Sequence, residues 1–505
     1  MRERRVATHG TSGGASAGRG GPAGAVGRSR APRCFEIALL TLVAVLDAVI
    51  IAVLPACFRE IGLAFEATQS SLGGVLFVRG LAQAGAALLA GISSPRVERP
   101  MLILAGCWTW GVGAACLGAA PNIGCMLFAV ALNGVGAGIL KPVLISMLAD
   151  LAPKGGSGKT FSLYDFTNSV AGVLGATTAT VIAPLSVPHI GGAWRLLFLA
   201  LSAAAGLLGS AVGLLTFDPR GSAATRPGAV GALAAFTAVT KIKTFWAIIW
   251  QGAFGSMPWQ AIGFFTLYFE LGCFSNAAAA ALFAVFRTGC ALGALLGGIV
   301  GDALDHYSPN HGRPCAALIS VGCGLPFTFL LLIVMTPWLG DTDAVLHFGV
   351  TLFAMGLCIT WCASGVNRPI FAAIVRSELR PTIYALDAVL EGAVGSFGSL
   401  AVGILADRYL ISGGAGGTSG SSAGNLAVDG AEGALPRAGA SCAETRPAAI
   451  ALGRALFASL NVPWAMCFAA YCYLHCTYSK DRLRLQHQLA AAAAKDATTL
   501  AQCTA

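Results

Sequence analysis

The sequence predicts an all-α polytopic membrane protein, in which twelve transmembrane helices form two pseudo-symmetric six-helix bundles. Composition gives the first reason, because the chain of 505 residues is 56% hydrophobic and only 11% charged. A soluble domain carries about 25% charged residues. The apolar residues also gather in runs of the roughly 20 residues that a spanning helix needs. The third reason is a repeat of charged residues between the two halves of the chain.

The apolar runs fall into two groups of six, separated by a more polar stretch at residues 217–243. We expect this stretch to be a cytoplasmic central loop between an N-terminal bundle at 36–216 and a C-terminal bundle at 244–478. The twelve expected spans are residues 36–57, 71–92, 100–120, 123–150, 160–184, 194–216, 244–269, 277–301, 314–337, 346–375, 382–408 and 451–478.

Three segments outside the spans have distinct compositions. Residues 1–35 hold seven arginines against one acid, which is typical of a disordered basic tail, and an organelle transit peptide stays open as the alternative. Residues 411–450 are rich in Gly and Ser, so we expect a flexible loop there, and a cytoplasmic tail at 479–505. The loop cations gather on the side of the termini, which predicts that both termini are cytoplasmic. The sequence does not identify the host membrane, and an organelle membrane is one of the alternatives.

A cation recurs at matching places in the second and eighth spans. Arg79 lies six residues before Gly85, and Arg287 lies six residues before Gly293. A charge inside an apolar segment is costly and usually functional. The match therefore predicts a duplicated membrane protein with a polar centre.

A second pair of cations recurs in the fourth and tenth spans. Lys141 precedes Pro142, and Arg368 precedes Pro369, each within a long apolar run. We expect the two prolines to kink these helices. Lys141 lies about 13 Å from the end of its span, at 1.5 Å per residue, so it cannot easily reach that surface. Because the four cations occupy equivalent helices of the two halves, we expect them to surround one cavity.

Local motifs in the spans carry a family resemblance. They include Phe77-Val-Arg79-Gly-Leu-Ala-Gln83 in the second span, Asn133-Gly-Val-Gly136 in the fourth and Asn367-Arg368-Pro369-Ile-Phe-Ala372 in the tenth. These motifs resemble the major facilitator superfamily, and within it the spinster-like group with its plant-type and protist relatives. The resemblance covers nearly the whole membrane region. It implies a secondary transporter that holds its substrate between two halves and rocks them in turn.

The loop after the eighth span carries a specific part of this resemblance. It reads Gly297-Gly-Ile-Val-Gly301-Asp302 and then Gly312-Arg313-Pro314, which is close to the family's gating signature. The resemblance implies that Asp302 caps a neighbouring helix N-terminus and holds the cytoplasmic side shut. The first half departs from the pattern, because Pro95 stands where the family usually has an acid. The implied gating residues are Arg96, Arg99, Gly298, Gly301, Asp302, Gly312 and Arg313.

The central cations favour a small organic substrate that is anionic or zwitterionic. The predicted binding residues are Arg79, Lys141, Arg287 and Arg368, together with Asn133, Tyr164, Tyr384 and Trp361 on the same pathway helices. The last four are also open to interpretation as packing residues. The spinster-like resemblance implies lysolipids or sphingolipids as one candidate substrate.

The acids of the spans are candidates for proton coupling. Asp387 and Glu391 are four residues apart, so they face the same way on the eleventh span. Two acids so close can hold a proton between them, as a proton-coupled carrier needs. Asp47 is the second choice, and Asp165 is a further candidate. The alternative, in which the acids simply pair with the cations in a sealed structural network, stays open.

Other chemistry has little support in the sequence. Gly155-Gly-Ser-Gly158-Lys159 lacks the first glycine of a phosphate loop, because Pro153 stands there, so ATP-driven transport is not expected. The cysteines lie scattered in apolar segments and are expected to pack as small apolar residues. His475, between Cys472 and Cys476, fits packing or lipidation better than a metal site.

We therefore expect no cofactor, no metal and no nucleic-acid partner. The expected protein is a monomer in the lipid bilayer that exchanges a small-molecule substrate and, if coupled, protons. A membrane-embedded enzyme or a non-transporting receptor is the alternative. An enzyme would need a nucleophile, metal ligands or an acid–base pair near one membrane surface, whereas these charges lie deep and the cations lie symmetrically.

Overall fold

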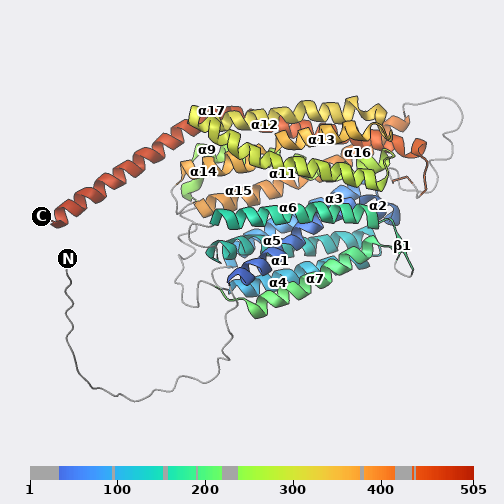
Figure 1. Ribbon diagram of the computed structural model, residues 1–505, viewed down its shortest axis with the longest axis horizontal. Helices are drawn as coiled ribbons and strands as arrows, with labels where there is room; N and C mark the ends of the chain where they lie inside the picture. Colours follow the sequence, from blue (N-terminus) through green and yellow to red (C-terminus); the bar gives the residue numbers. More distant parts are fainter. Residues whose placement is uncertain are drawn as a thin grey trace, which may run out of the picture.

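The computed structural model describes residues 33–93, 97–151, 157–188, 191–218, 237–375, 380–415, 435–436 and 439–504. Its helices run side by side along one long direction (Figure 1). One end of the bundle, which we call the α2 end, holds the short helix α2 (Phe58–Phe65). The long helix α17 (Cys442–Thr504) leaves the bundle at the opposite end, which we call the α17 end.

The N-terminal half is built from helices that cross between these two ends, with a small hairpin at the α2 end. Its elements are α1 (Arg33–Ala56), α2, α3 (Gln69–Ser93), α4 (Arg99–Ala119), α5 (Ile123–Leu151), α6 (Ser157–Ile182), the antiparallel strands β1 (Ser186–Val187) and β2 (Gly191–Gly192), and α7 (Trp194–Leu215).

The C-terminal half repeats this plan with more interruptions. Its elements are α9 (Lys243–Ala261), the 3-10 turn η1 (Ile262–Phe264), α10 (Phe265–Leu271), α11 (Asn276–Tyr307), α12 (Gly312–Phe329), the π-turn η2 (Leu330–Val334), the 3-10 turn η3 (Thr336–Trp338), α13 (Val345–Ile359), the π-turn η4 (Cys362–Asn367), α14 (Arg368–Ile374), α15 (Arg380–Gly395), α16 (Phe397–Ala415) and α17.

The helices confirm a nearly all-helical membrane fold. Within the described residues, nine helices are long and apolar enough to cross a membrane, and two shorter apolar helices lie at Phe166–Ile182 and Val345–Ile359. Helical residues fall in every one of the twelve expected spans. The structure is thus consistent with twelve crossings, while the number itself stays a prediction.

The tenth span is interrupted by a π-turn just before its proline, rather than simply kinked there. After α13 the chain makes the π-turn η4, and Pro369 stands in the first turn of α14. A proline inside a continuous α-helix would lose a hydrogen bond and crowd the preceding turn, and the π-turn changes the hydrogen-bond pattern at this point. Pro142, by contrast, lies inside the single helix α5.

The ends of the C-terminal half also differ from the expected boundaries. Helix α16 continues to Ala415 and α17 begins at Cys442, so both ends of the expected flexible loop are helical. Helix α17 then runs without a break through the expected tail to Thr504. The Ala-rich sequence of the tail has high helix propensity, which explains this continuation.

Two cysteines correct the expectation that all of them pack as small apolar residues. Cys273, just after α10, forms a disulfide with Cys442 at the start of α17. Their Cα atoms lie 5.6 Å apart, which suits a disulfide. The sequence offers no spacing signal for this pair, because 169 residues separate the two cysteines.

The two halves are in close contact at the α2 end. We call the contact surface between the two halves the seam. Helices α3 and α16 pack against each other at this end of the seam, and α6 and α11 pack against each other along it (Figure 1). Small residues allow this approach: a side chain added at Gly73 would strike the Ser399 carbonyl, and one added at Gly403 would strike the Gln69 carbonyl. Among the described residues, every cross-half hydrogen bond lies near this end, from Arg59 to Asn276, from Gln69 and Ser70 to Asp407, and from Ser399 to Gly73.

Candidate functional site

The repeated cation of the N-terminal half lies in a compact, buried polar cluster. Arg79 on α3 is 6% exposed, and its Nη2 lies 2.6 Å from Oδ1 of Asp47 on α1. Its Nε donates to Oδ1 of Asn133 at 3.0 Å, and its Nη1 donates to Gln83 at 3.3 Å. Asn133 in turn donates to the Trp110 carbonyl at 3.1 Å. The guanidinium is therefore paired and hydrogen-bonded, as a buried charge must be.

A glycine explains why this cluster can form. Gly134 lies against the backbone carbonyl of Arg79, which a larger side chain would strike. Helices α3 and α5 therefore approach closely at this level, which brings Asn133 within reach of Arg79. Small residues serve this purpose widely in membrane helix packing.

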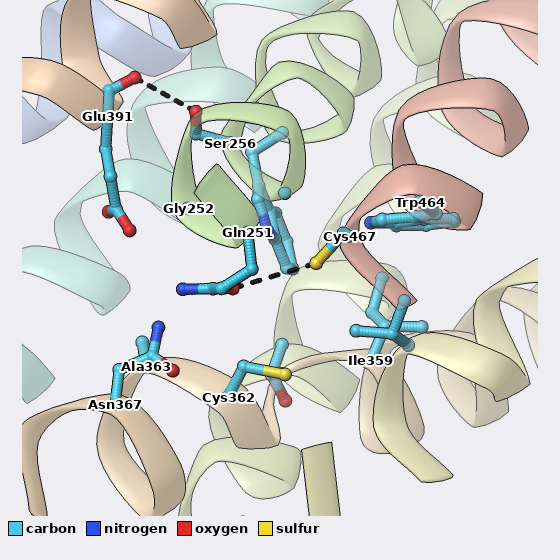
Figure 2. Close-up of a pocket in the computed structure, with 14 residues that line it drawn as sticks. Gln251, Gly252, Ser256, Ile359, Cys362, Ala363, Asn367, Glu391, Trp464 and Cys467 are labelled. Carbon is cyan, nitrogen blue, oxygen red and sulfur yellow. Dashed lines mark hydrogen bonds between the residues drawn. The ribbon is translucent and has the colours of Figure 1, made fainter. Parts of the chain in front are cut away.

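The C-terminal half places two acids together on α15. Asp387 and Glu391 hydrogen-bond to each other through their side chains, as their spacing predicts. Glu391 lies so close to Gly252 on α9 that any side chain at Gly252 would collide with its carboxylate. The backbone of Glu391 is held by Ser256, whose hydroxyl donates to its carbonyl at 2.9 Å (Figure 2). Helix α9 thus fixes the position of Glu391.

A cavity of about 280 Å³ opens beside these acids, entirely among helices of the C-terminal half. Figure 2 shows Gln251, Asn367 and Glu391 around it, with Trp464 and Cys467 on another side. The polar lining consists of neutral groups and one carboxylate, and it includes no Lys or Arg. Such a mixture of apolar walls and few polar groups is typical of small-molecule sites.

Gln251 is a cavity residue that the sequence did not single out. It is 3% exposed, and its Oε1 accepts a hydrogen bond from the Cys467 thiol at 3.7 Å. Its Nε2 has no protein partner among the described residues and points towards the cavity (Figure 2). Across the cavity, Asn367 Oδ1 accepts from the Tyr471 hydroxyl at 2.8 Å. In the sequence, the one sign of its role is that a polar glutamine stands inside an apolar span.

The other three repeated cations have different surroundings. Lys141 is exposed on α5, and Arg287 is half-buried on α11. Within the described residues, neither makes a hydrogen bond or ion pair. Arg368 lies where α14 begins and interacts electrostatically with Asp387. That the four cations surround one cavity stays a prediction.

The remaining pathway residues are also placed. Trp361 is 8% exposed, its indole N–H donates to the Leu357 carbonyl at 2.8 Å, and Gly297 packs against it. Tyr164 is partly buried against the core of the bundle. The side chains of Tyr384 and Asp165 lie outside the described residues.

At the α17 end, Arg99 forms the centre of a charge network in the N-terminal half. Its side chain is fully buried and lies 2.7 Å from Asp150 and 2.6 Å from Asp218. It also donates to Ser146 at 3.1 Å. These partners tie the start of α4 to the end of α5 and to the chain after α7. Arg96, the other predicted gating residue of this half, lies outside the described residues.

Arg313 holds the corresponding place in the C-terminal half. It lies 2.7 Å from Asp302 and 3.4 Å from Asp305, and it donates to the Gly365 carbonyl at 2.8 Å. The side chain of Asp302 is 75% exposed, so in this conformation it pairs with Arg313 rather than capping a neighbouring helix.

The predicted gating glycines differ from one another. Side chains added at Gly301 and Gly312 would strike the backbone carbonyls of Gly365 and Leu304, so both glycines allow close packing. A side chain added at Gly298 would meet open space. In this conformation, close packing therefore requires a glycine at positions 301 and 312 but not at position 298.

No metal centre is assembled by the described residues, since no group of three or more potential ligands occurs among them. His475 instead stacks on His311, with their Nδ1 atoms 2.9 Å apart. Cys472 and Cys476 are both exposed.

The sequence and the fold can now be compared with known proteins. The family model described as Major Facilitator Superfamily matches residues 37–399. The chain belongs to this superfamily. A comparison with curated protein sequences finds no match. The superfamily and the structural neighbours are transporters, so the alternative of a membrane-embedded enzyme loses its support.

Solved structures of transporters share this fold. A bacterial homologue of the human lysosomal transporter Spinster, inward-facing and unoccupied, has a TM-score of 0.71 at 18% identity, covering 89% of this chain and 98% of that one. The D-xylose-proton symporter has a TM-score of 0.60 at 14% identity, with 74% and 90% covered. The nucleoside transporter NupG has a TM-score of 0.60 at 10% identity, with 88% and 98% covered. The chain is thus a multi-pass membrane transporter of the superfamily, and its resemblance to the spinster-like group is supported.

Proposed function

We propose that this superfamily member is a secondary active transporter that moves a small organic solute by alternating access between its two halves. The observation that carries the proposal is the hydrogen-bonded contact between the halves at the α2 end. Their cross-half hydrogen bonds gather at the α2 end within the described residues. Closure at one end is what a carrier needs in order to expose a site to the other side.

We further propose that the α17 end faces the cytoplasm. The loop cations favour this orientation by the positive-inside rule. The disulfide between Cys273 and Cys442 supports it independently, because it lies at the opposite end of the bundle. Disulfides persist on the extracytosolic side of cellular membranes, where the environment is oxidising. The conformation described here is then closed on the extracytosolic side, and both termini are cytoplasmic.

For the substrate we propose a small zwitterion, recognised mainly by the C-terminal half. Arg287 makes no ion pair within the described residues, so its charge is available for an anionic group. The cavity in the same half offers the carboxylate of Glu391 and the side chain of Gln251, which suit an ammonium or hydroxyl group. Together these groups match both ends of a zwitterion. Arg368 and Asn367 would contribute from the tenth span.

A lysolipid or sphingolipid is the second substrate candidate. It rests on the spinster-like resemblance and on the likeness to the bacterial homologue of the lysosomal transporter Spinster. A head group that carries phosphate and ammonium would meet the same pair of requirements. The cavity of about 280 Å³ suits a head group or a small solute, and an acyl chain would need additional space between the halves.

We propose that Asp387 and Glu391 carry the coupling proton. A hydrogen bond between two carboxyl groups needs a proton on one of them, so the pair is suited to bind and release one. Its place beside the cavity would let the same movement expose both proton and solute. Asp47 is the weaker candidate, because it is already paired with Arg79 at 2.6 Å.

Uptake by the purified protein in proteoliposomes tests these proposals. A metabolite mixture is offered at two external pH values, and the accumulated solutes are identified by mass spectrometry. We expect Arg287→Ala to abolish uptake without loss of the folded protein, and Glu391→Gln to abolish the response to a pH gradient while exchange of solute persists. Asp341→Asn, an exposed acid at the α2 end, is the matched control and should leave both unchanged. Normal transport by Arg287→Ala would refute its role.

A further inference from the structure

The start of helix α3 is capped by a residue of the opposite half. The backbone N–H groups of Gln69 and Ser70 donate to the two carboxylate oxygens of Asp407, at 3.0 and 2.9 Å. Asp407 belongs to α16 and is 9% exposed. One carboxylate from the C-terminal half therefore caps a helix of the N-terminal half.

The physical role of this contact follows from the start of a helix. The first N–H groups of a helix have no partner within it, and the helix dipole favours a negative charge there. Thr68, in the same half, satisfies only one of these groups, because its hydroxyl accepts from the Ser71 N–H at 3.2 Å. Asp407 satisfies two more and supplies the negative charge.

The packing around Asp407 shows that the contact depends on the halves being together. Gly73 and Gly403 bring the backbones of α3 and α16 close, and Ser399 donates across the seam to the Gly73 carbonyl at 3.2 Å. The rings of Phe77 and Phe397 lie 4.8 Å apart further along. If the halves separate at the α2 end, Asp407 loses both hydrogen bonds at once.

We propose that Asp407 is a latch for one conformation: it stabilises the state closed at the α2 end, and this end opens only after the carboxylate leaves the start of α3. The inference rests on the proposed alternating access. Asp407 would be a gating residue outside the gating signature in the loop after the eighth span. A cap of this kind is worth up to a factor of about ten in an equilibrium.

The chain offers a matched control of the same chemistry. Asp481 on α17 accepts from the Thr244 N–H at 2.9 Å and so caps the start of α9. Both α9 and α17 belong to the C-terminal half, so this cap does not break when the halves separate. Loss of Asp481 should therefore loosen one helix end without changing the balance between conformations.

Hydrogen–deuterium exchange of the full-length protein in nanodiscs tests the latch and needs no substrate. We expect Asp407→Asn and Asp407→Ala to speed exchange up to about tenfold on both sides of the seam, at residues 69–76 and 396–407. Asp481→Asn should speed exchange only near the start of α9. Thr68→Ala should speed exchange only in the first turn of α3.

Faster exchange confined to the first turn of α3 in both Asp407 variants would overturn the proposal, because Asp407 would then be only a local cap. A misfolded variant would be recognised by faster exchange throughout, and the milder Asp407→Asn still decides the question. The transport proposal fails separately, through absence of uptake in proteoliposomes.

A second observation at the same end concerns a partly buried acid and a buried acid from opposite halves. Glu60 lies on α2 and Glu270 lies on α10, and their charges act on each other. Glu270 is 4% exposed, and neither of its carboxylate oxygens has a hydrogen-bond partner among the described residues. The cation facing both is Arg59, which also donates to Asn276 at 3.3 Å, and Cys57 is the other titratable group that faces them.

The charge state of Glu60 depends on pH in the physiological range. Burial raises its pKa from 4.5 to about 7, although its backbone hydrogen bond and Arg59 oppose the shift. A raised pKa means that the closed state favours the protonated acid. The stability of the closed state is therefore complete below about 4.5 and is lost as the pH rises through about 7.

We infer that protonation of the Glu60 and Glu270 pair closes the α2 end and that ionisation favours its opening. In the wild type, the exchange protection of residues 69–76, corrected for the intrinsic rate, should fall between about pH 5 and pH 8. Glu60→Gln and Glu270→Gln should each flatten this dependence, and Glu66→Gln, at an exposed acid just after the end of α2, should not. An unchanged pH dependence in both variants would overturn the inference.

Discussion

The two halves share their repeated cations but handle charge in different ways. In the N-terminal half, Arg79 and Asp47 form one compensated ion pair, completed by Asn133. In the C-terminal half, Arg287 makes no ion pair within the described residues, while two acids lie together beside a cavity. The difference teaches that one fold can pair a repeated charge in one half and leave its counterpart without an ion pair among the described residues of the other.

The largest expected effect on stability comes from removing the ion pair between Arg79 and Asp47. Asp47→Ala leaves the buried guanidinium of Arg79 without its partner, and we expect a loss of about 3–5 kcal/mol in the free energy of unfolding. Denaturant titration in detergent, followed by tryptophan fluorescence, measures it. The double variant Asp47→Ala/Arg79→Gln should recover part of the loss. A cost below about 1 kcal/mol for Asp47→Ala, as for exposed ion pairs, would contradict the burial argument.

An intermediate effect is expected from the glycines that mark the repeat. A side chain at Gly293 would strike Thr360 and the Leu357 carbonyl, so Gly293→Ala should destabilise by about 1–3 kcal/mol. Its counterpart Gly85 faces open space, and Gly85→Ala should be neutral or stabilise by up to about 1 kcal/mol. Thermal unfolding of the two variants side by side tests the contrast. Equal shifts would mean that the halves pack alike.

The smallest effect on stability is expected at Arg287. Arg287→Ala should change the free energy of unfolding by less than about 0.5 kcal/mol, because Arg287 makes no ion pair or hydrogen bond among the described residues. The same denaturant titration measures it, with Arg79→Ala as the matched substitution in the other half. A loss as large as that of Arg79→Ala would show that Arg287 is a structural residue and would remove the contrast between the halves.

Much of this architecture follows from one-dimensional patterns. Runs of apolar residues place the helices, and the spacing of Asp387 and Glu391 places both acids on one face. Contacts between distant segments cannot be read in the same way. The pairing of Arg79 with Asp47, the cap from Asp407 and the disulfide of Cys273 with Cys442 each join residues that no period connects.

The candidate site was predicted in part. The sequence identified its charged members, because a charge in an apolar run is conspicuous. It did not identify Gln251, since an uncharged amide gives a weaker signal, nor the cavity, which depends on how α9, α15 and α17 pack. The π-turn η4 was also missed, because Cys362–Asn367 carries ordinary helix-compatible residues around one glycine.

Helix α17 gives the C-terminal half a lever arm. It leaves the bundle at the α17 end as an unbroken continuation of the last span (Figure 1). About 20 residues beyond the bundle reach roughly 30 Å at 1.5 Å per residue, so a rotation of the half by about 15° would sweep the tip through about 8 Å. A movement that is small at the cavity is thus amplified at the tip, where a fluorescent label would report it.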